Sequence, residues 1–283
     1  MKDESNIEKE NMKRLFLMSM LLLSLHVAAK KERVEIQGAV GKLVAEIQVP
    51  DAAEGKKVPM VIICHGFSAN RGGLLLESIA DSLEAHGVAS IRFDFNGHGE
   101  SEGSFEHMTV LNEIEDAKHV YEYVSSLPYV SKVAILGHSQ GGVVTAMTAA
   151  QLGKEKLVAE VLLAPAGVLR DDALRGNLFG KSYDPHNLPE KAHVWGDLWL
   201  GREYARIAQT LPIYETAREY KGRAYVIHGT YDTVVPYTYG QRFHYVVKDS
   251  KLTLLEGLDH GFSGNEAKVA ALSTAFLLDS LAP

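Results

Sequence analysis

The chain has a single cysteine among its 283 residues, and this excludes a disulfide bond within it. That residue, Cys64, ends the apolar run Val61–Cys64, where a small buried side chain is expected rather than a reactive thiol. Metal-binding patterns such as H-E-x-x-H, C-x-x-C and the EF-hand loop are also missing, and the twelve histidines are scattered. The sequence therefore predicts no metal and no cofactor.

Basic residues are fewer than acidic ones, 29 against 36, which gives a net charge of −7. This balance, without a long lysine or arginine run, argues against nucleic acid or an anionic membrane surface as a partner. A net negative charge of this size is sufficiently explained by its contribution to solubility. With 46% hydrophobic residues, the chain can form one large core, and its length fits a single α/β domain.

A long apolar run occurs near the start of the chain, over Leu15–Leu25, after the basic Met12–Arg14 and before the small residues Val27–Ala29. This order predicts a secretory signal peptide with a short leader over residues 1–29, with Met12 as an alternative start. The run is too short to span a membrane comfortably, although an uncleaved anchor is the alternative. The domain over residues 30–283 is then expected to be periplasmic or secreted, without stable membrane insertion.

Apolar segments alternate with helical patterns through the rest of the chain, as a mostly parallel sheet requires. The first two predicted strands carry alternating polar residues and suit an antiparallel edge, whereas the others are apolar throughout. The predicted strands are Arg33–Gln37, Lys42–Gln48, Met60–Cys64, Ala89–Phe93, Val133–Leu136, Ala159–Leu163, Ala224–Ile227 and Leu252–Leu255. The predicted helices are Leu74–His86, Val110–Leu127, Gln140–Leu152, Tyr237–Val247 and Asn265–Leu281.

The alternation is interrupted between Pro165 and Lys221, where more than fifty residues intervene. A strand–helix–strand crossover needs only about 25 to 30 residues. The excess holds both tryptophans, Trp195 and Trp199, together with several glycines and prolines. We therefore expect an inserted cap over about residues 168–214, with a small aromatic core of its own, above the C-terminal edge of the sheet.

The pentapeptide Gly137–Gly141 has the form G-x-S-x-G, and it stands between the predicted strand Val133–Leu136 and an alanine-rich helix. A strand that turns sharply into a helix needs small residues around a strained serine, and it exposes the serine oxygen at the edge of the sheet. Ser139 is therefore the predicted nucleophile. A structural turn serine is the alternative.

A serine nucleophile needs a histidine base and a carboxylate that orients the histidine, and with this turn they follow in the order serine, acid, histidine. Asp232 and His260 each follow a predicted strand at its carboxyl end, where sites in open α/β sheets lie. A turn-capping aspartate and a surface histidine are the alternatives. Asp259 is the rival acid, but it is adjacent to His260, so the two side chains should diverge.

Acyl transfer also needs two N–H donors for the oxyanion. The backbone N–H of Gln140 supplies one, and that of Phe67, after the strand ending at Cys64, is the best candidate for the other. His65 is expected to stabilise this loop rather than act as a second base. The polar turn Asp94–Ser101 is interpreted as architecture around the pocket.

Taken together, several segments resemble the α/β-hydrolase superfamily from about Val34 onward, and more closely the cinnamoyl (feruloyl) esterases of gut bacteria. They are Cys64–Arg71, Arg92–Ser101, Leu136–Gly142, Leu163–Ala166 and Leu211–Glu215. The resemblance implies an eight-stranded, mostly parallel sheet flanked by helices, with a small inserted cap. It also implies a serine carboxylesterase without a cofactor that releases hydroxycinnamic acids such as ferulate from plant cell-wall esters. The implied substrate is a small aryl ester or a feruloylated oligosaccharide.

In that subgroup the cap holds the hydroxycinnamoyl ring. The resemblance implies that Asp171, or alternatively Asp172, meets the phenolic hydroxyl and that Tyr204 contacts the ring, although both could be ordinary cap residues. Leu178–Phe179 departs from the family by replacing a polar position, which makes the pocket more apolar and leaves the preferred acyl group open.

Three alternatives remain at this point. The chain could be a general short-chain carboxylesterase, a small serine peptidase of the same fold, or a non-catalytic binding module that retains the fold. Exposed apolar surface on the cap could serve a homodimer as readily as a substrate.

Overall fold

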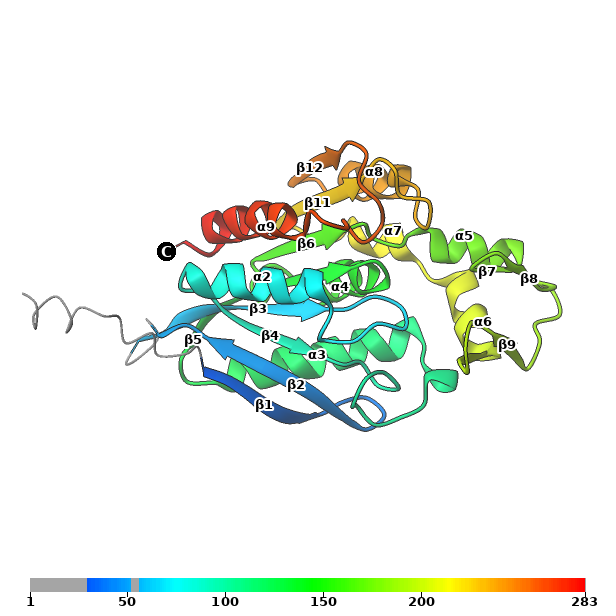
Figure 1. The fold of residues 1–283 in the computed structure, drawn as a ribbon, viewed down its shortest axis with the longest axis horizontal. Helices are drawn as coiled ribbons and strands as arrows, with labels where there is room; N and C mark the ends of the chain where they lie inside the picture. Colours follow the sequence, from blue (N-terminus) through cyan, green and yellow to red (C-terminus); the bar gives the residue numbers. More distant parts are fainter. Residues whose placement is uncertain (1–29, 52–55, 283) are drawn as a thin grey trace, which may run out of the picture.

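The computed structural model of the protein describes residues 30–51 and 56–282 (Figure 1). Eight strands form one sheet in the order β1-β2-β4-β3-β5-β6-β11-β12. β1 pairs with β2, and β2 with β4, in antiparallel fashion, and the remaining neighbours are parallel. The signal peptide predicted over residues 1–29 lies outside the described residues.

The strands of the large sheet are β1 (Lys30–Gln37), β2 (Lys42–Val49), β3 (Val58–Cys64), β4 (Ala89–Phe93), β5 (Val130–His138), β6 (Ala159–Leu163), β11 (Arg223–Gly229) and β12 (Ser250–Leu255). The helices around it are α2 (Leu74–Ala85), α3 (Val110–Ser126), α4 (Gln140–Leu152), α7 (Ile213–Ala217), α8 (Tyr237–Val246) and α9 (Glu266–Leu281), with the 3₁₀ helix η2 (Phe105–His107). The insertion contains α5 (Val168–Arg175), β7 (Asn177–Leu178), β8 (Lys181–Ser182), β9 (Lys191–His193), β10 (Trp199–Gly201) and α6 (Arg202–Thr210).

The central strands are apolar throughout because helices cover both faces of the sheet. Along β3, Met60 and Ile62 join a core cluster formed with α3 and α4. Val61 and Ile63 point the opposite way, into a second cluster formed with α2 and α9. Successive side chains of a strand face opposite sides, so a continuous apolar run supplies both cores at once.

All eight predicted strands and all five predicted helices are present, and only their ends differ. β1 begins three residues before the predicted Arg33, and β5 runs beyond Val133–Leu136 at both ends. In β1, Ile36 is buried whereas Glu35 and Gln37 are exposed, which is the alternation expected of an antiparallel strand at the edge.

The insertion forms a cap beyond the carboxyl ends of the parallel strands, at the end of the molecule toward which β3 and β6 point (Figure 1). The expected aromatic core around both tryptophans is wrong in one respect, because Trp195 and Trp199 are each 42% exposed. Two short helices and two hairpins cannot enclose side chains of that size. Trp195 instead packs against Phe67 of the main domain and Phe179 of the cap.

Within the described ranges, no helix is both long enough and apolar enough to cross a membrane.

Glu160 is the second residue of β6, where it is fully buried, and neither of its carboxylate oxygens has a hydrogen-bond partner among the described residues. Burial raises the pKa of Glu160 well above its usual value. An unfolded glutamate ionises near pH 4.3, so stability should fall as the pH rises above about 4.3 until the folded carboxyl also ionises.

We expect Glu160→Met to raise the free energy of unfolding by about 1–3 kcal/mol at pH 7, because it removes a buried polar group without a partner. The gain should grow with pH over the range in which only the unfolded carboxyl is charged. Denaturant unfolding of both proteins at pH 5, 7 and 9 measures it. A loss of stability at every pH would show that Glu160 has a stabilising partner.

Candidate active site

Ser139 occupies the tight turn between β5 and α4 with φ of 57° and ψ of −122°, a backbone conformation that residues other than glycine rarely adopt. The glycines around it are required because there is no room for a side chain at their positions. A Cβ at Gly137 would lie 2.1 Å from the carbonyl oxygen of Gly141, and a Cβ at Gly141 would lie 2.2 Å from that of His65. These close approaches place the serine side chain at the start of α4, at the carboxyl edge of the sheet.

The structure brings Ser139, His260 and Asp232 into one hydrogen-bonded chain. His260 follows β12 and Asp232 follows β11, as the sequence predicts. His260 Nδ1 lies 2.7 Å from Asp232 Oδ2, and His260 Nε2 lies 2.9 Å from Ser139 Oγ. The Asp232 carboxylate accepts a hydrogen bond from the N–H at Nδ1, so Nε2 is left with its lone pair toward the serine hydroxyl, which is the arrangement of a general base.

Asp232 is held by more groups than His260 alone. Its Oδ1 accepts the backbone N–H groups of Val234 and Val235, at 2.9 and 2.8 Å, and its Oδ2 also accepts His228 Nε2 at 3.0 Å. Burial acts to raise the pKa of Asp232, but the hydrogen bonds from His228 and His260 outweigh it and hold the pKa below its usual value. The carboxylate therefore stays ionised and fixed in position at neutral pH.

Two further histidines support this arrangement, and the sequence analysis missed both. His228 also lies 2.9 Å from the carbonyl oxygen of Val235, so its Nε2 carries the proton. His138 Nε2 lies 2.8 Å from the carbonyl oxygen of His260, and burial lowers the pKa of His138 to about 4. The sequence signal that could have identified them is their position, because each histidine lies at the carboxyl end of a predicted parallel strand.

The two predicted oxyanion donors lie on either side of the nucleophile. In the described part of the chain, the N–H groups of Phe67 and Gln140 donate to no backbone carbonyl. A Cβ at Gly66 would lie 3.0 Å from Ser139 Cβ, which places the Phe67 loop directly against the serine. Both donors are therefore free to bind a negative oxygen formed beside Ser139.

The Phe67 loop is held by buried polar groups. His65 Nδ1 donates to the carbonyl oxygen of Gly66 at 2.8 Å, and its Nε2 accepts the N–H of Phe95 at 3.1 Å. Burial and the nearby His98 lower the pKa of His65 to about 3, so it stays neutral. His65 thus has the structural contacts expected of it, and its ring is not directed at Ser139.

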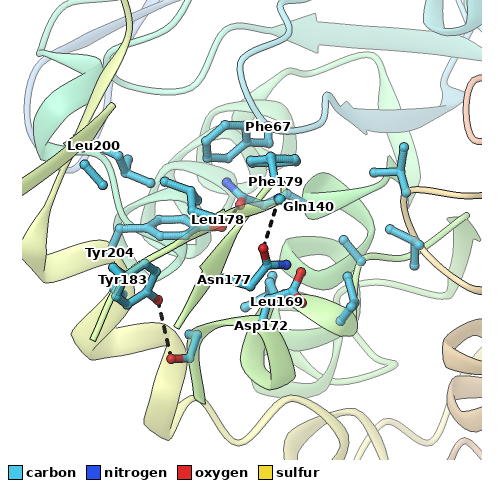
Figure 2. Close-up of a pocket in the computed structure, with 18 of the residues that line it drawn as sticks. Phe67, Gln140, Leu169, Asp172, Asn177, Leu178, Phe179, Tyr183, Leu200 and Tyr204 are labelled. Atoms are coloured by element: carbon cyan, nitrogen blue, oxygen red, sulfur yellow. Dashed lines mark hydrogen bonds between the residues drawn. The ribbon is translucent and has the colours of Figure 1, made fainter. Parts of the chain in front are cut away.

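A cavity of about 330 Å³ lies between Ser139 and the cap (Figure 2). Most of its lining is apolar, and the polar side chains are few. Its wall includes Phe67, Ser139, Gln140, Leu169, Asp172, Ala173, Asn177, Leu178, Phe179, Tyr183, Leu200, Tyr204 and Val235. Such a chamber fits an apolar group about the size of one aromatic ring with a polar substituent.

The prediction for Asp171 is corrected by its position. Asp171 is not part of the cavity wall, and its Oδ2 accepts the hydroxyl of Tyr239 on α8 at 2.7 Å. Asp172, the alternative, does line the cavity. Successive residues of a helix point about 100° apart, and α5 is turned so that Leu169, Asp172 and Ala173 face the chamber whereas Asp171 does not.

Tyr204 lines the cavity as expected, but its hydroxyl is already engaged. It donates to Oε1 of Gln140 at 2.6 Å. Leu178 and Phe179 also line the wall, so the chamber is apolar where the resemblance suggested a polar residue. Phe179 has φ of 48° and precedes Gly180 at 82°, which are the backbone angles of a tight hairpin turn between β7 and β8.

No group of three or more histidine, cysteine, aspartate or glutamate side chains in the described ranges could hold a metal ion.

Comparisons with known proteins agree with this geometry. Residues 55–186 match the family model described as serine aminopeptidase, S33. An uncharacterized 31.7 kDa protein from the traX-finO intergenic region of Escherichia coli is 31% identical over 116 residues, which make up 40% of each chain. Mitochondrial palmitoyl-protein thioesterase ABHD10 of Mus musculus is 29% identical over 39% of this chain and 35% of that protein. The chain thus matches well under two thirds of the length of these curated relatives.

A solved structure gives a more extensive match. Est1E from Butyrivibrio proteoclasticus, with ferulic acid bound, is 30% identical and has a TM-score of 0.84. The match covers 88% of this chain and 100% of that chain. The predicted fold class, an eight-stranded and mostly parallel sheet flanked by helices with an inserted cap, is confirmed.

Proposed function

The chain belongs to the α/β-hydrolase superfamily, and from this premise we propose that it is a serine carboxylesterase that hydrolyses small aryl esters, hydroxycinnamate esters such as those of ferulate among them. One observation carries the proposal. The hydrogen-bonded chain Ser139–His260–Asp232 ends at a mostly apolar cavity with a carboxylate, Asp172, in its wall.

The first half of the reaction acylates the serine. Ser139 Oγ attacks the ester carbonyl carbon while His260 Nε2 takes its proton, and Asp232 stabilises the resulting imidazolium. The carbonyl oxygen becomes an oxyanion that accepts the N–H groups of Phe67 and Gln140. When the intermediate collapses, the bond to the alcohol oxygen breaks and His260 returns the proton to the departing alcohol.

The second half uses water. His260 removes a proton from a water molecule that attacks the acyl carbon, and the bond between Ser139 Oγ and the acyl group breaks. The proton held by His260 returns to Ser139, and the carboxylic acid leaves. No cofactor is needed for either half, because the nucleophile, the base and the oxyanion donors belong to the chain.

The acyl group is assigned to the cap cavity because this chamber opens on Ser139 and matches an aromatic ring in size and polarity. Asp172 would accept a hydrogen bond from a phenolic hydroxyl on that ring. The ferulic acid in Est1E, a relative of this chain, supports the same class of acyl group. The alcohol would be a small group or a sugar of a feruloylated oligosaccharide.

Asp172→Asn tests the phenol contact. We expect it to lower the preference for methyl 4-hydroxycinnamate over methyl cinnamate, measured as the ratio of kcat/KM values, by about 10- to 100-fold, since a hydrogen bond to a charged group contributes about 1.5–3 kcal/mol. The two esters differ only in the hydroxyl, so the ratio isolates its recognition.

Asp171→Asn is the matched control, because it makes the same change on the neighbouring residue outside the cavity wall. Its ratio should equal that of the parent. Loss of the preference in Asp171→Asn but not in Asp172→Asn would reverse the assignment and return it to the residue favoured by the resemblance.

A small serine peptidase is the second candidate, and the matching family model, described as a serine aminopeptidase, favours it. An aminopeptidase needs a carboxylate near Ser139 for the substrate's amino group, and Asp172 is the acid in the cavity wall. Turnover of aminoacyl p-nitroanilides at rates comparable to aryl esters would favour this candidate. Turnover of the esters without turnover of the anilides would exclude the peptidase candidate.

We also propose that the protein is exported through the segment over residues 1–29. The basic stretch Met12–Arg14, the apolar run Leu15–Leu25 and the small residues before Lys30 support this assignment. Cell fractionation followed by N-terminal sequencing tests it. A periplasmic or secreted product that begins near Lys30 is expected, and a product in the cytoplasm that retains the leader would contradict it.

A further inference from the structure

The side chain of Gln140 is held from two sides by groups that the reaction itself does not use. Its Nε2 donates to Oε2 of Glu113 on α3 at 2.8 Å, and its Oε1 accepts the hydroxyl of Tyr204 on the cap helix α6 at 2.6 Å. Gln140 and Glu113 are each 2% exposed, and Tyr204 is also buried. The residue that offers an oxyanion N–H is thus fixed between the main domain and the cap.

Among the described residues, the Gln140 side chain is the one hydrogen-bond partner of the Glu113 carboxyl group. Oε1 of Glu113 is buried and accepts no hydrogen bond from the described residues, and no basic side chain is paired with it there. A buried carboxyl with a single hydrogen bond is a costly feature, so its one contact, with Gln140, calls for an explanation.

Gln140 begins α4, and its own N–H is one of the two that face the oxyanion site. The side chain and the N–H of Gln140 are attached to the same Cα, so contacts that fix the side chain also restrain the backbone of the first helical turn, where the peptide plane of Ser139–Gln140 carries this N–H. Oxyanion stabilisation depends on a donor placed about 2.7–3.1 Å from the developing charge, so a small displacement is costly. A clamp on the side chain therefore acts on the donor.

We propose that Glu113 and Tyr204 are positioning residues that clamp the Gln140 side chain and so hold its backbone N–H in the oxyanion hole. This inference rests on the proposed esterase function. It assigns Tyr204 a role in turnover of every ester, whether or not the acyl group reaches the cap cavity, because α6 must be docked for the clamp to close. It also predicts that a charge on Glu113 affects the oxyanion site through Gln140.

The groups that face Glu113 are Asp116 on its own helix, Cys64 on β3 and Tyr204 on α6. Burial raises the pKa of the Cys64 thiol and of the Tyr204 phenol, so both stay neutral, and burial raises the pKa of Asp116 to about 6. Burial, together with the charge of Asp116, raises the pKa of Glu113 to about 8 despite the hydrogen bond from Gln140.

Glu113 is therefore neutral at pH 7 and becomes an anion above about pH 8. A buried negative charge beneath the oxyanion site opposes the second negative charge that forms there during catalysis. Activity should accordingly be full while Glu113 is protonated and should decline as the pH rises through about 8.

Tyr204→Phe tests the clamp with p-nitrophenyl acetate, whose acetyl group is too small to reach a ring contact. We expect kcat to fall about tenfold with KM within about twofold of the parent, less than the 10²–10³-fold loss of a whole oxyanion donor. Tyr220→Phe is the matched control, because Tyr220 is also buried and its hydroxyl donates a hydrogen bond, 2.7 Å long, to the carbonyl oxygen of Leu157, away from the site. It should keep the parental kcat.

Glu113→Gln tests the charge, because glutamine keeps the hydrogen bond to Gln140 and cannot ionise. At pH 7 we expect kcat/KM within about twofold of the parent. Between pH 7 and 9.5 the parent should lose about tenfold, whereas this variant should stay level. Glu113→Ala, which removes the hydrogen bond to Gln140, should lower kcat/KM about tenfold at pH 7. Glu160→Gln is the control, because it makes the same change at a buried glutamate in β6, and it should keep the parental pH profile.

Two results would overturn the inference. One is a Tyr204→Phe variant with unchanged acetate turnover and a raised KM for aryl esters only, which would make Tyr204 a ring contact. The other is an alkaline decline that is identical in the parent and in Glu113→Gln. An inactive parent would instead reject the proposed esterase function, so the two failures are distinguishable.

Discussion

Ser139→Ala should lower kcat for ester hydrolysis by about 10⁶-fold, because nucleophile, base and acid act as a unit and removal of the nucleophile removes the covalent route. The remaining rate should come from the oxyanion donors Phe67 and Gln140 and from substrate binding. Initial rates with p-nitrophenyl butyrate at high enzyme concentration measure the loss.

The control for this prediction compares the single variants with the double variant, because the losses should not add. His260→Ala should cost about as much as Ser139→Ala, and the double variant should lose no more than either single one. The melting temperature of Ser139→Ala should stay close to that of the parent, since one buried hydroxyl is removed and the backbone turn is unchanged. A Ser139→Ala variant within tenfold of the parental rate would exclude Ser139 as the nucleophile.

Asp232→Asn should lower kcat by about 10⁴-fold at pH 7, because an amide no longer fixes the proton of His260 on Nδ1 or stabilises the imidazolium. The contacts of the carboxylate explain why one atom matters so much. Its Oδ2 accepts His260 and His228 together, at 2.7 and 3.0 Å, and an amide nitrogen in that position would meet two donors.

Asp259→Asn is the matched control for this acid. Asp259 is adjacent to His260 in the sequence, but its Oδ1 accepts a hydrogen bond from the backbone N–H of Ser263 at 2.8 Å, whereas the histidine ring is hydrogen-bonded to Asp232. The control should retain kcat within about twofold of the parent. If Asp259→Asn lost activity and Asp232→Asn kept it, the assignment of the acid would have to be exchanged.

The sheet and the position of the triad residues were predictable from the sequence. The glycines around Ser139 and the strands before Asp232 and His260 are local features, and the parallel topology brings them together. The glycines around Ser139 mark a turn that no larger residue can form, as the 2.1 Å approach at Gly137 shows. Asp232 and His260 follow the last two parallel strands, and the carboxyl ends of such strands meet at one edge. Chain order was therefore sufficient to choose them among many aspartates and histidines.

The cap was not predictable in the same way. Neighbouring aspartates on α5 differ only in the rotational phase of the helix, and phase is set by packing of Asp171 against Tyr239 of the distant α8. The clamp on Gln140 likewise joins α3, α4 and α6, which are far apart in the sequence. A buried glutamate such as Glu113 resembles any exposed helical glutamate until the tertiary structure is known.

The most direct test of the whole account is kcat/KM of the full-length protein for methyl ferulate against methyl butyrate. The two esters share the leaving alcohol, so the ratio reports the acyl group alone. Burial of an aromatic ring in the cap cavity should favour ferulate by at least about tenfold. An equal or higher value for methyl butyrate, with Ser139 still essential, would contradict the aryl-ester assignment and identify a general short-chain esterase.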